Sequence, residues 1–363
     1  MGKRTNTAKW VESAGRWQIN VQKDGIRKTF TSAKPGRTGQ REANAKADAW
    51  LDEGLELRRK TLGQIFPEYL AELQERTGKS NWRPVEYRWR VWISPVLGRL
   101  RPDALSDAHL QRVITRAYSQ GGLSRKSLMN IRADMVALVK YLRRNHLSTY
   151  HPEDIIIPQG AKVGERRILQ PDDLVALFSV DTTEFRGKIS RDRYINAYRF
   201  QAVTGLRPGE LMGIMASDIS GNTIRLQRSI NAYGELTAGK NDNARRAFRL
   251  TPTAKAILYD QLKRMDSLYV FGISTEENYR KRWKKYCGTN NIPYVAPYEL
   301  RHTFVSMIQS LPEGWVKTLV GHSKSMDTFG VYGHAIDGQG DQIAAGVEGV
   351  IQDILTGISE DAK

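Results

Sequence analysis

Cysteine is almost absent from the 363-residue chain, in which Cys287 is the only one. No disulfide can therefore form within the chain, and no cysteine cluster can hold a metal ion, which fits a reducing cytosol. Long apolar runs are absent as well, since no segment approaches the roughly 18 apolar residues that cross a membrane. The polar start MGKRTNTAKW lacks the apolar stretch of a signal peptide. We expect a cytoplasmic protein with no membrane partner, no metal and no cofactor.

Acidic residues are few relative to basic ones, with 39 Asp and Glu against 56 Lys and Arg, which gives a formal net charge of +17. Such an excess of one sign repels itself unless a polyanion neutralises it, and nucleic acid is the commonest polyanion. A basic protein without such a partner is the alternative. The chain is too long for one compact core, so we predict two or three domains.

The first 60 residues are predicted to form a small sheet and one helix. In RWQINVQ, the residues Trp17, Ile19 and Val21 alternate with polar ones, as in a strand with one buried face. Residues 1–38 hold nine Lys and Arg against two Asp and Glu. We therefore predict a DNA-binding domain at residues 1–60, with a merely solvated basic face as the alternative. The expected DNA contacts here are Arg16, Arg27 and Lys28.

Residues 61–152 are predicted to form an all-helical module of four or five helices. TLGQIFPEYLAELQER has apolar residues at helical spacing, and a linker punctuated by Pro and Gly follows the module at residues 153–167. WRPVEYRWRVWISPVLG interleaves aromatic residues with arginines. The spacing of the Trp residues favours core positions, whereas the arginines favour phosphate contact. The expected DNA contacts in this module are Arg83, Arg88, Arg90, Arg125 and Lys126.

Residues 168–340 are predicted to form a mixed α+β domain that is mainly helical. Helices are expected near residues 171–180 and 190–203, followed by a short meander of strands within residues 223–251 and then by more helices. Two further candidates for DNA contact in the meander are Arg245 and Arg246.

Two motifs of this domain place an arginine near the start of a helix. TGLRPGEL puts Arg207 before Pro208, whose fixed φ suits the first helical position. Glu210 then falls in the first turn, where its charge complements the helix dipole. A capped helix with a surface arginine explains this octapeptide equally well. In PYELRHTFVSMIQSL, Tyr298 and Arg301 are three apart and share a face, where the arginine can present a donor fork to a phosphate.

Two other motifs add a lysine, a histidine and a tyrosine. Lys240 lies in AGKNDN, a turn-rich loop between two expected strands, and His322 follows the end of an expected helix at Gly321. Tyr332 comes ten residues later in HSKSMDTFGVYGH. Each residue is weak evidence alone, because loop lysines are usually solvated and a tyrosine beside Phe329 is usually half-buried packing.

These motifs, taken in order along the chain, resemble those of the tyrosine recombinases, the phage-integrase type of site-specific DNA recombinase. The resemblance covers residues 168–340 and is looser over the helical module. The N-terminal sheet is similar to the arm-type DNA-binding domain of phage and transposon integrases. The resemblance implies an enzyme that integrates or excises a phage or mobile element. A type IB topoisomerase-like enzyme and a catalytically silent DNA-binding regulator are the alternatives.

The resemblance also implies a role for each motif residue. Tyr332 would attack the phosphodiester and form a 3′-phosphotyrosine, which keeps the bond energy for rejoining. Arg207 and Arg301 would clamp the non-bridging oxygens. His322 would hydrogen-bond the phosphate, and Lys240 would be the general acid toward the leaving 5′ hydroxyl.

One position departs from the family pattern. Where these enzymes most often have His, this chain has Tyr298, and a phenol is a poor general base at neutral pH. It can still donate a hydrogen bond to the phosphate or the nucleophile. The group that takes the proton from Tyr332 therefore stays open. Behind the phosphate-binding residues, Glu210 is expected to orient Arg207.

The implied partners are double-stranded DNA attachment sites of the core type and the arm type, in the bacterial nucleoid. A homotetramer on DNA and an accessory DNA-bending or excision factor are expected as well. The tail at residues 341–363 has apolar residues at spacings of three and four, which predicts a helix with an apolar stripe. This helix either packs on its own domain or docks in a neighbouring subunit, as is common in the family.

Overall fold

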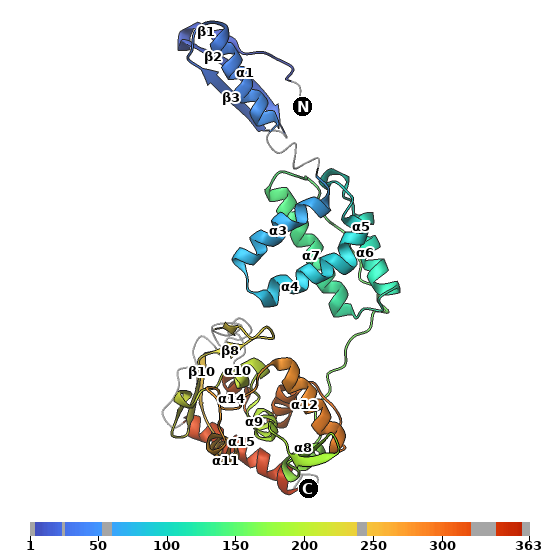
Figure 1. Cartoon of the computed structure of the whole chain (residues 1–363), viewed down its shortest axis with the longest axis vertical. Coiled ribbons are helices and arrows are strands. Elements are labelled where there is room, and N and C mark those ends of the chain that lie inside the picture. The colour runs from blue at the N-terminus through green and yellow to red at the C-terminus, as the bar shows by residue number, and fades with distance from the viewer. Residues whose placement is uncertain (1–3, 24–25, 53–59, 238–244, 321–338, 358–363) are drawn as a thin grey trace. The chain divides into compact units, whose positions relative to one another are not determined.

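The computed structural model describes residues 4–23, 26–52, 60–237, 245–320 and 339–357, and it divides into two compact units, residues 1–164 and 165–363 (Figure 1). The boundary between the units falls inside the segment that the sequence marks as a linker. The described residues are mainly helical and the sheets are small and antiparallel, which confirms the predicted class at this level. None of the helices described is long and apolar enough to span a membrane.

The first unit begins with a three-stranded antiparallel sheet in the order β1–β2–β3, which packs against one helix. The elements are β1 (Lys9–Val11), β2 (Arg16–Lys23), β3 (Ile26–Ser32) and α1 (Gly36–Asp52). Ile19 and Val21 of β2 are buried with Ala43 and Ala47 of α1, whereas Trp17 is half-buried. The alternation in β2 therefore predicts the buried face correctly.

Helices make up the rest of the first unit around a separate hydrophobic core. They are α3 (Leu62–Arg76), α4 (Lys79–Arg88), the π-helix η2 (Trp89–Ile93), α5 (Ser94–Leu97), the 3-10 turn η3 (Pro102–Ala104), α6 (Asp107–Ser119) and α7 (Arg125–Arg144). Leu62, Ile65 and Phe66 of α3 are buried, and the ring of Phe66 stacks on that of Trp89 with centroids 4.1 Å apart. Trp89 thus belongs to the core, as the spacing of the aromatic residues indicates, while Tyr87 is exposed.

The second unit packs its helices around α9, which lies in its middle (Figure 1). The helices are α8 (Pro171–Ser179), α9 (Ile195–Thr204), α10 (Pro208–Met212), α11 (Pro252–Lys263), α12 (Glu276–Thr289), α13 (Pro297–Met307), α14 (Glu313–Val320) and α15 (Gln339–Thr356). The strands are β4 (Thr182–Phe185), β5 (Lys188–Arg191), β6 (Ile219–Ser220), β7 (Thr223–Leu226), β8 (Ser229–Ile230), β9 (Leu236–Thr237) and β10 (Arg246–Arg249). Tyr198 and Phe200 of α9 are fully enclosed, and Tyr198 packs against Trp283 of α12. The helix is therefore a core element rather than an amphipathic surface helix.

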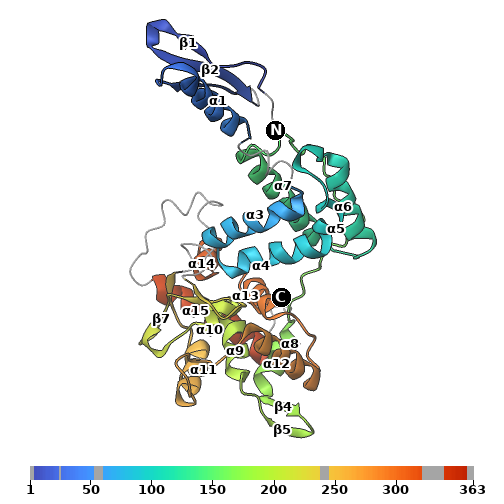
Figure 2. The same cartoon turned by 45° about the horizontal axis from the view of Figure 1, so that its top comes forward.

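The predicted start of a helix at residue 190 is wrong, because residues 182–191 form the hairpin β4–β5. The loop of this hairpin has two residues, Arg186 and Gly187, both with positive φ (53° and 76°). Two positive φ values are typical of a type I′ turn, whose twist matches that of the strands. An Arg-Gly pair is a weaker signal for this turn than Asn-Gly or Asp-Gly. Figure 2 shows the β4–β5 hairpin projecting from the second unit.

The strands between α10 and α11 do not form the simple meander that the sequence predicts. β7 pairs with β10, with Leu226 opposite Arg246, and β6 pairs with the other edge of β7. The intervening β8 and β9 form their own hairpin. The segment that contains Lys240 therefore connects this inserted hairpin to β10.

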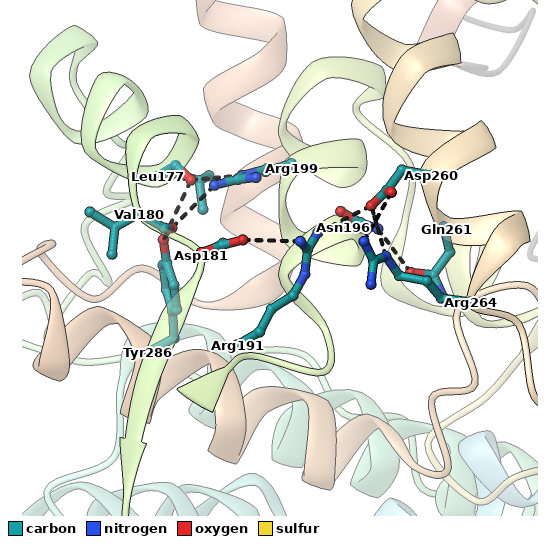
Figure 3. Close-up of polar contacts among 10 residues, drawn as sticks. All are labelled: Leu177, Val180, Asp181, Arg191, Asn196, Arg199, Asp260, Gln261, Arg264 and Tyr286. Carbon is teal, nitrogen blue, oxygen red and sulfur yellow. Dashed lines mark hydrogen bonds and ion pairs between the residues drawn. The ribbon is translucent and has the colours of Figure 1, made fainter. Parts of the chain in front are cut away.

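A polar network fastens the base of the β4–β5 hairpin to the neighbouring helices (Figure 3). Arg191 of β5 pairs with Asp181 and with Asp260 of α11, each at 3.1 Å. Asp260 also accepts hydrogen bonds from Asn196 (3.0 Å) and Arg264 (3.1 Å). Asp260 thus connects the hairpin, the start of α9 and α11.

The tail helix α15 packs on its own unit. Ile343, Val347 and Ile351 of the apolar stripe are buried in the core of the second unit. The side chain of Glu348 accepts hydrogen bonds from the backbone nitrogen (3.0 Å) and the hydroxyl (2.7 Å) of Thr253. The described part of the tail therefore takes the first of the two predicted arrangements, because the unit itself offers a complementary apolar surface.

Candidate active site

The turn between α9 and α10 places Arg207 at the start of α10. Gly205 ends α9 with a left-handed φ of 62°, and a Cβ there would lie 2.3 Å from Cδ1 of Phe304. Only glycine fits this conformation and this close approach. Pro208 then takes the first helical position, and the backbone nitrogen of Arg207 donates to Oε2 of Glu210 at 3.0 Å. The helix start that the motif predicts is thus confirmed.

Glu210 lies at the centre of the site, with a side chain that is 2% exposed. Its Oε1 accepts from Nη1 of Arg207 at 2.7 Å, and both of its oxygens accept from the guanidinium of Arg246 at 3.1 Å. Burial alone would raise the pKa of Glu210, but the hydrogen bonds and charges of Arg246 and Arg207 hold that pKa below its ordinary value. The carboxylate therefore stays ionised and binds two guanidinium groups.

Arg301 of α13 is almost fully buried beside this group, with 3% of its surface exposed. Its Nη1 donates to the carbonyl oxygen of Gly205 at 2.9 Å, and its Nη2 donates to that of Val320. Burial, and then the positive charge of Arg207, lower the pKa of Arg301 to about 10, so the guanidinium remains protonated at neutral pH. Arg207, Arg246 and Arg301 form what we call the arginine cluster, and its positive charge exceeds the single negative charge of Glu210. A buried excess of positive charge suits an anionic group.

Arg246 is the member of the cluster that the sequence does not predict at the active site. The sequence makes it a candidate for DNA contact in the strand meander, yet its side chain is 9% exposed. Besides Glu210, it binds the carbonyl oxygen of Leu319 through Nε at 2.9 Å. The alternation along β10 carries a signal for this orientation, because Arg246 and Phe248 are half-buried whereas Ala247 and Arg249 are exposed. Arg246 thus faces inward with Phe248.

Three predicted site residues, Lys240, His322 and Tyr332, lie outside the described residues. Their described neighbours lie against α10, β10 or the arginine cluster. The hairpin before Lys240 packs directly on α10, since a Cβ at Gly209 would lie 2.5 Å from Oγ of Ser229.

The segment with His322 and Tyr332 begins after α14, whose last two carbonyl groups are bound by Arg246 and Arg301. Beyond the segment, Asp341 pairs with Arg249 of β10 at 3.3 Å. The residues that flank the segment on both sides are therefore fastened to β10 or to the cluster.

Tyr298, at the position where the family most often has His, is 46% exposed, in contrast to Arg301 one turn later. Its ring makes an edge contact with His302, with centroids 5.5 Å apart. Burial, and then the charges of Arg166 and Arg301, lower the pKa of His302, so its imidazole is neutral at pH 7. The motif spacing does not point to His302, because it follows Arg301 directly, whereas Tyr298 precedes Arg301 by three residues.

Most residues predicted to contact DNA are exposed: Arg16, Arg27, Lys28, Arg83, Arg90, Arg125, Lys126 and Arg245. Arg88 differs, because its side chain is 21% exposed and donates to Asp134 through Nη2 at 3.1 Å. It bridges α4 and α7 within the helical module. Among the described residues, no group of three or more His, Cys, Asp or Glu side chains could hold a metal ion.

The chain shares its fold with solved integrases of the tyrosine recombinase class, the class that the motifs resemble. Among solved structures, the integrase of transposon Tn1549 in complex with transposon right end DNA is similar over 80% of this chain and 99% of its own, with a TM-score of 0.60 and 17% identity. The lambda integrase dimer bound to a COC′ core site is similar over 93% of this chain and 99% of its own, with a TM-score of 0.57 and 15% identity. The lambda integrase tetramer bound to a Holliday junction covers the same shares, with a TM-score of 0.58 and 14% identity.

No protein-family model matches the chain, and no curated protein is similar to it in sequence. At identities this low, the likeness to the integrases is one of fold.

Proposed function

We propose that the chain is a site-specific DNA recombinase that cleaves and rejoins strands through a 3′-phosphotyrosine, and thereby integrates or excises a phage or mobile element. The observation that carries the proposal is the arginine cluster around Glu210. The motifs single out Arg207 and Arg301 from segments far apart in the sequence, and both approach one buried carboxylate in an integrase fold.

The cluster is suited to the charge of a phosphodiester under attack. Arg207 and Arg301 bind the non-bridging oxygens and stabilise the negative charge that develops on them. Arg301 uses one N–H of each terminal nitrogen on a backbone carbonyl, so its plane is fixed before DNA binds. Glu210 fixes Arg207 in the same way. This preorganisation lowers the cost of reaching the transition state.

The remaining roles follow from the family resemblance. The oxygen of Tyr332 attacks phosphorus, a 3′-phosphotyrosyl bond forms, and the bond to the 5′ oxygen breaks. Lys240 gives a proton to that oxygen, and His322 hydrogen-bonds the phosphate. Support comes from the flanks of these residues, which are attached to the arginine cluster or to β10.

The DNA partners that we propose are core-type sites for the helical module and the second unit, and arm-type sites for the N-terminal sheet. The exposed basic residues of both parts of the first unit support this assignment. A homotetramer on DNA is the proposed assembly, supported by the lambda integrase tetramer on a Holliday junction. An accessory bending or excision factor and a location in the bacterial nucleoid complete the proposal.

A nicked suicide duplex that carries the attachment site, taken from the DNA that flanks the gene, tests the proposed activity. The protein should form a covalent adduct and exchange strands, and Tyr332→Phe should bind the duplex but form no adduct. An adduct with relaxation alone would indicate a type IB topoisomerase. Tight binding without any adduct would indicate a regulator. An adduct formed by Tyr332→Phe would move the nucleophile to another tyrosine.

A further inference from the structure

A cationic hollow lies at the C-terminal end of α7, away from the residues used so far. Its volume is about 510 Å³. Three cationic side chains, two imidazoles and two hydroxyl groups line it: Lys140, Arg143, Arg144, His146, His151, Ser148 and Thr149. No carboxylate is among these lining residues. The chemistry of this lining fits a phosphoryl group rather than a cation or an apolar ligand.

The backbone around the end of α7 explains why the hollow exists. His146 has a left-handed φ of 55°, which ends the helix and turns the following residues back over its last turn. Its backbone nitrogen donates to the carbonyl of Arg143 at 3.0 Å, and that of Leu147 donates to the carbonyl of Leu142 at 2.8 Å. These bonds satisfy carbonyl groups that would otherwise repel an anion. Ser148, which also lines the hollow, is held in place by donating to the carbonyl of Pro102 at 3.0 Å.

The residues that the structure describes do not compensate all the charges of the hollow. Arg144 is bound to Glu72 at 2.6 Å. In contrast, neither Lys140 nor Arg143 forms an ion pair with any residue that the structure describes. These two side chains therefore provide a free pair of positive charges beside the hydroxyl of Thr149, because the hydroxyl of Ser148 already donates to Pro102. Basic side chains and hydroxyls are the groups that most often contact nucleic-acid phosphates.

The position of the hollow separates it from Arg125 and Lys126, two of the predicted DNA contacts of the helical module. Arg125 and Lys126 are in the first turn of α7, and the helix has 20 residues. At about 1.5 Å per residue the two ends are about 30 Å apart. Five of the seven lining residues are exposed, so the hollow is open along the surface. An open site suits a phosphate within a long chain better than a ligand that has to be enclosed.

We propose that this hollow binds the phosphate backbone of DNA, as a second contact of the helical module beyond the one at the start of α7. The proposal rests on the proposed function, since it assumes that the chain binds DNA. DNA carries one negative charge per roughly 1.7 Å of its axis, so a duplex that crosses the hollow presents phosphates to both Lys140 and Arg143.

The test compares Lys140→Ala/Arg143→Ala with the parent and with Arg193→Ala/Lys281→Ala. The control variant removes the same two positive charges from exposed ion pairs of the second unit. Binding of a long linear duplex is followed by fluorescence anisotropy over about 50 to 200 mM salt. The hollow variant should bind more weakly, and its plot of log affinity against log salt should be flatter by about two, at about 0.9 per lost contact. The control should keep the slope of the parent.

An unchanged slope in the hollow variant, with the parent and the control binding normally, would overturn this inference and leave the proposed function intact. No DNA binding by the parent would overturn both. Thermal unfolding with tripolyphosphate tests whether the hollow binds a small phosphate compound instead of the DNA backbone. If tripolyphosphate stabilises the parent and not the variant while the DNA slopes agree, the hollow takes a small phosphate and the DNA assignment is wrong. Equal melting temperatures without ligand would show that the variant is folded.

Discussion

Two carboxylates of the second unit, Glu210 and Asp260, each collect several cationic or amide side chains, but their burial differs. The side chain of Glu210 is 2% exposed and that of Asp260 is 38% exposed. Hydrogen bonds from Arg264 and Asn196 lower the pKa of Asp260, and hydrogen bonds from arginines offset the burial of Glu210. Both groups are therefore ionised at neutral pH, although only Glu210 is almost fully desolvated by its burial.

We interpret this difference as the one between a cluster that serves the proposed chemistry and a structural cluster. Exposed ion pairs are solvated with or without their partner, so they contribute about 0–1 kcal/mol. A buried carboxylate with two arginines has a high desolvation cost, and apolar residues often replace such groups without loss of stability. The Asp260 network of Figure 3 holds a hairpin in place. The Glu210 cluster is arranged at a cost in stability, which is expected where the charge itself serves the chemistry.

Removing the buried carboxylate should have the largest effect on stability. In Glu210→Ala, Arg207 and Arg246 remain close together without their counter-charge, and breaking a buried pair from one side costs about 3–5 kcal/mol. Hydrogen exchange of the α9 amide groups measures this loss for the second unit alone. Glu210→Gln, which keeps the shape and one acceptor, should lose less. A loss below about 1 kcal/mol in Glu210→Ala would mean that Glu210 contributes no more to stability than an exposed ion pair does, and the two carboxylates would not differ.

Substitution of Arg246 tests whether this side chain positions the other residues of the site or contacts DNA itself. It joins Glu210 to the carbonyl of Leu319, so Arg246→Ala should slow adduct formation at saturating DNA by about a hundredfold through misplacement, with little change in affinity. Arg246→Lys should recover part of the rate, because it keeps the charge but loses the fork. Arg245→Ala is the matched comparison, because this neighbour is exposed and is a predicted DNA contact, so it should weaken binding and leave the rate at saturating DNA unchanged. Weaker binding with a normal rate would instead restore the role that the sequence suggests for Arg246.

Acid should weaken the contribution of both carboxylates to stability. The pKa of Glu210 is below its ordinary value of 4.5 in the folded chain, so its ionised form stabilises the fold above pH 4.5. That stabilisation is lost as the pH falls through the lowered pKa. The difference in unfolding free energy between the parent and Glu210→Gln should therefore be largest near neutral pH and shrink below pH 4.5. The same comparison with Asp260→Asn should change in the same direction, because the pKa of Asp260 is lowered as well. A difference for Glu210→Gln that stayed constant in acid would contradict the lowered pKa of Glu210.

The sequence predicts the buried cluster better than the exposed network. Arg207 and Glu210 follow from local rules, because Pro208 fixes the helix start and Glu210 then falls in its first turn. Arg301 follows from the family motif. Arg246 does not, since its bond to Leu319 joins residues 73 apart and no local pattern encodes that approach. Its inward orientation could be inferred only after the position of β10 was known.

The exposed network depends on elements whose local signals are weak. The β4–β5 hairpin turns on Arg186 and Gly187, a pair that common turn rules rank below Asn-Gly, so the sequence suggests an early helix start instead. Asp260 pairs with Arg191 across 69 residues, which sequence spacing cannot reveal. The tail helix shows a third limit. Its apolar stripe predicts burial, but only the structure shows that the covering surface belongs to the same unit.

The smallest effect is expected from Asp260→Ala. The substitution removes the acceptor of Arg191 and Arg264, but both guanidinium groups are at least 39% exposed and regain water. Asn196 keeps a partner, because its amide also donates to Gln261 at 3.1 Å. The α9 amide groups should therefore exchange with a loss of at most about 1 kcal/mol, and the rate of adduct formation should match the parent. Arg264→Ala, which deletes one exposed partner, serves as the control and should give a similar small loss. If Asp260→Ala destabilised α9 as much as Glu210→Ala, burial would not be what distinguishes the two clusters, and the functional reading of Glu210 would lose its energetic basis.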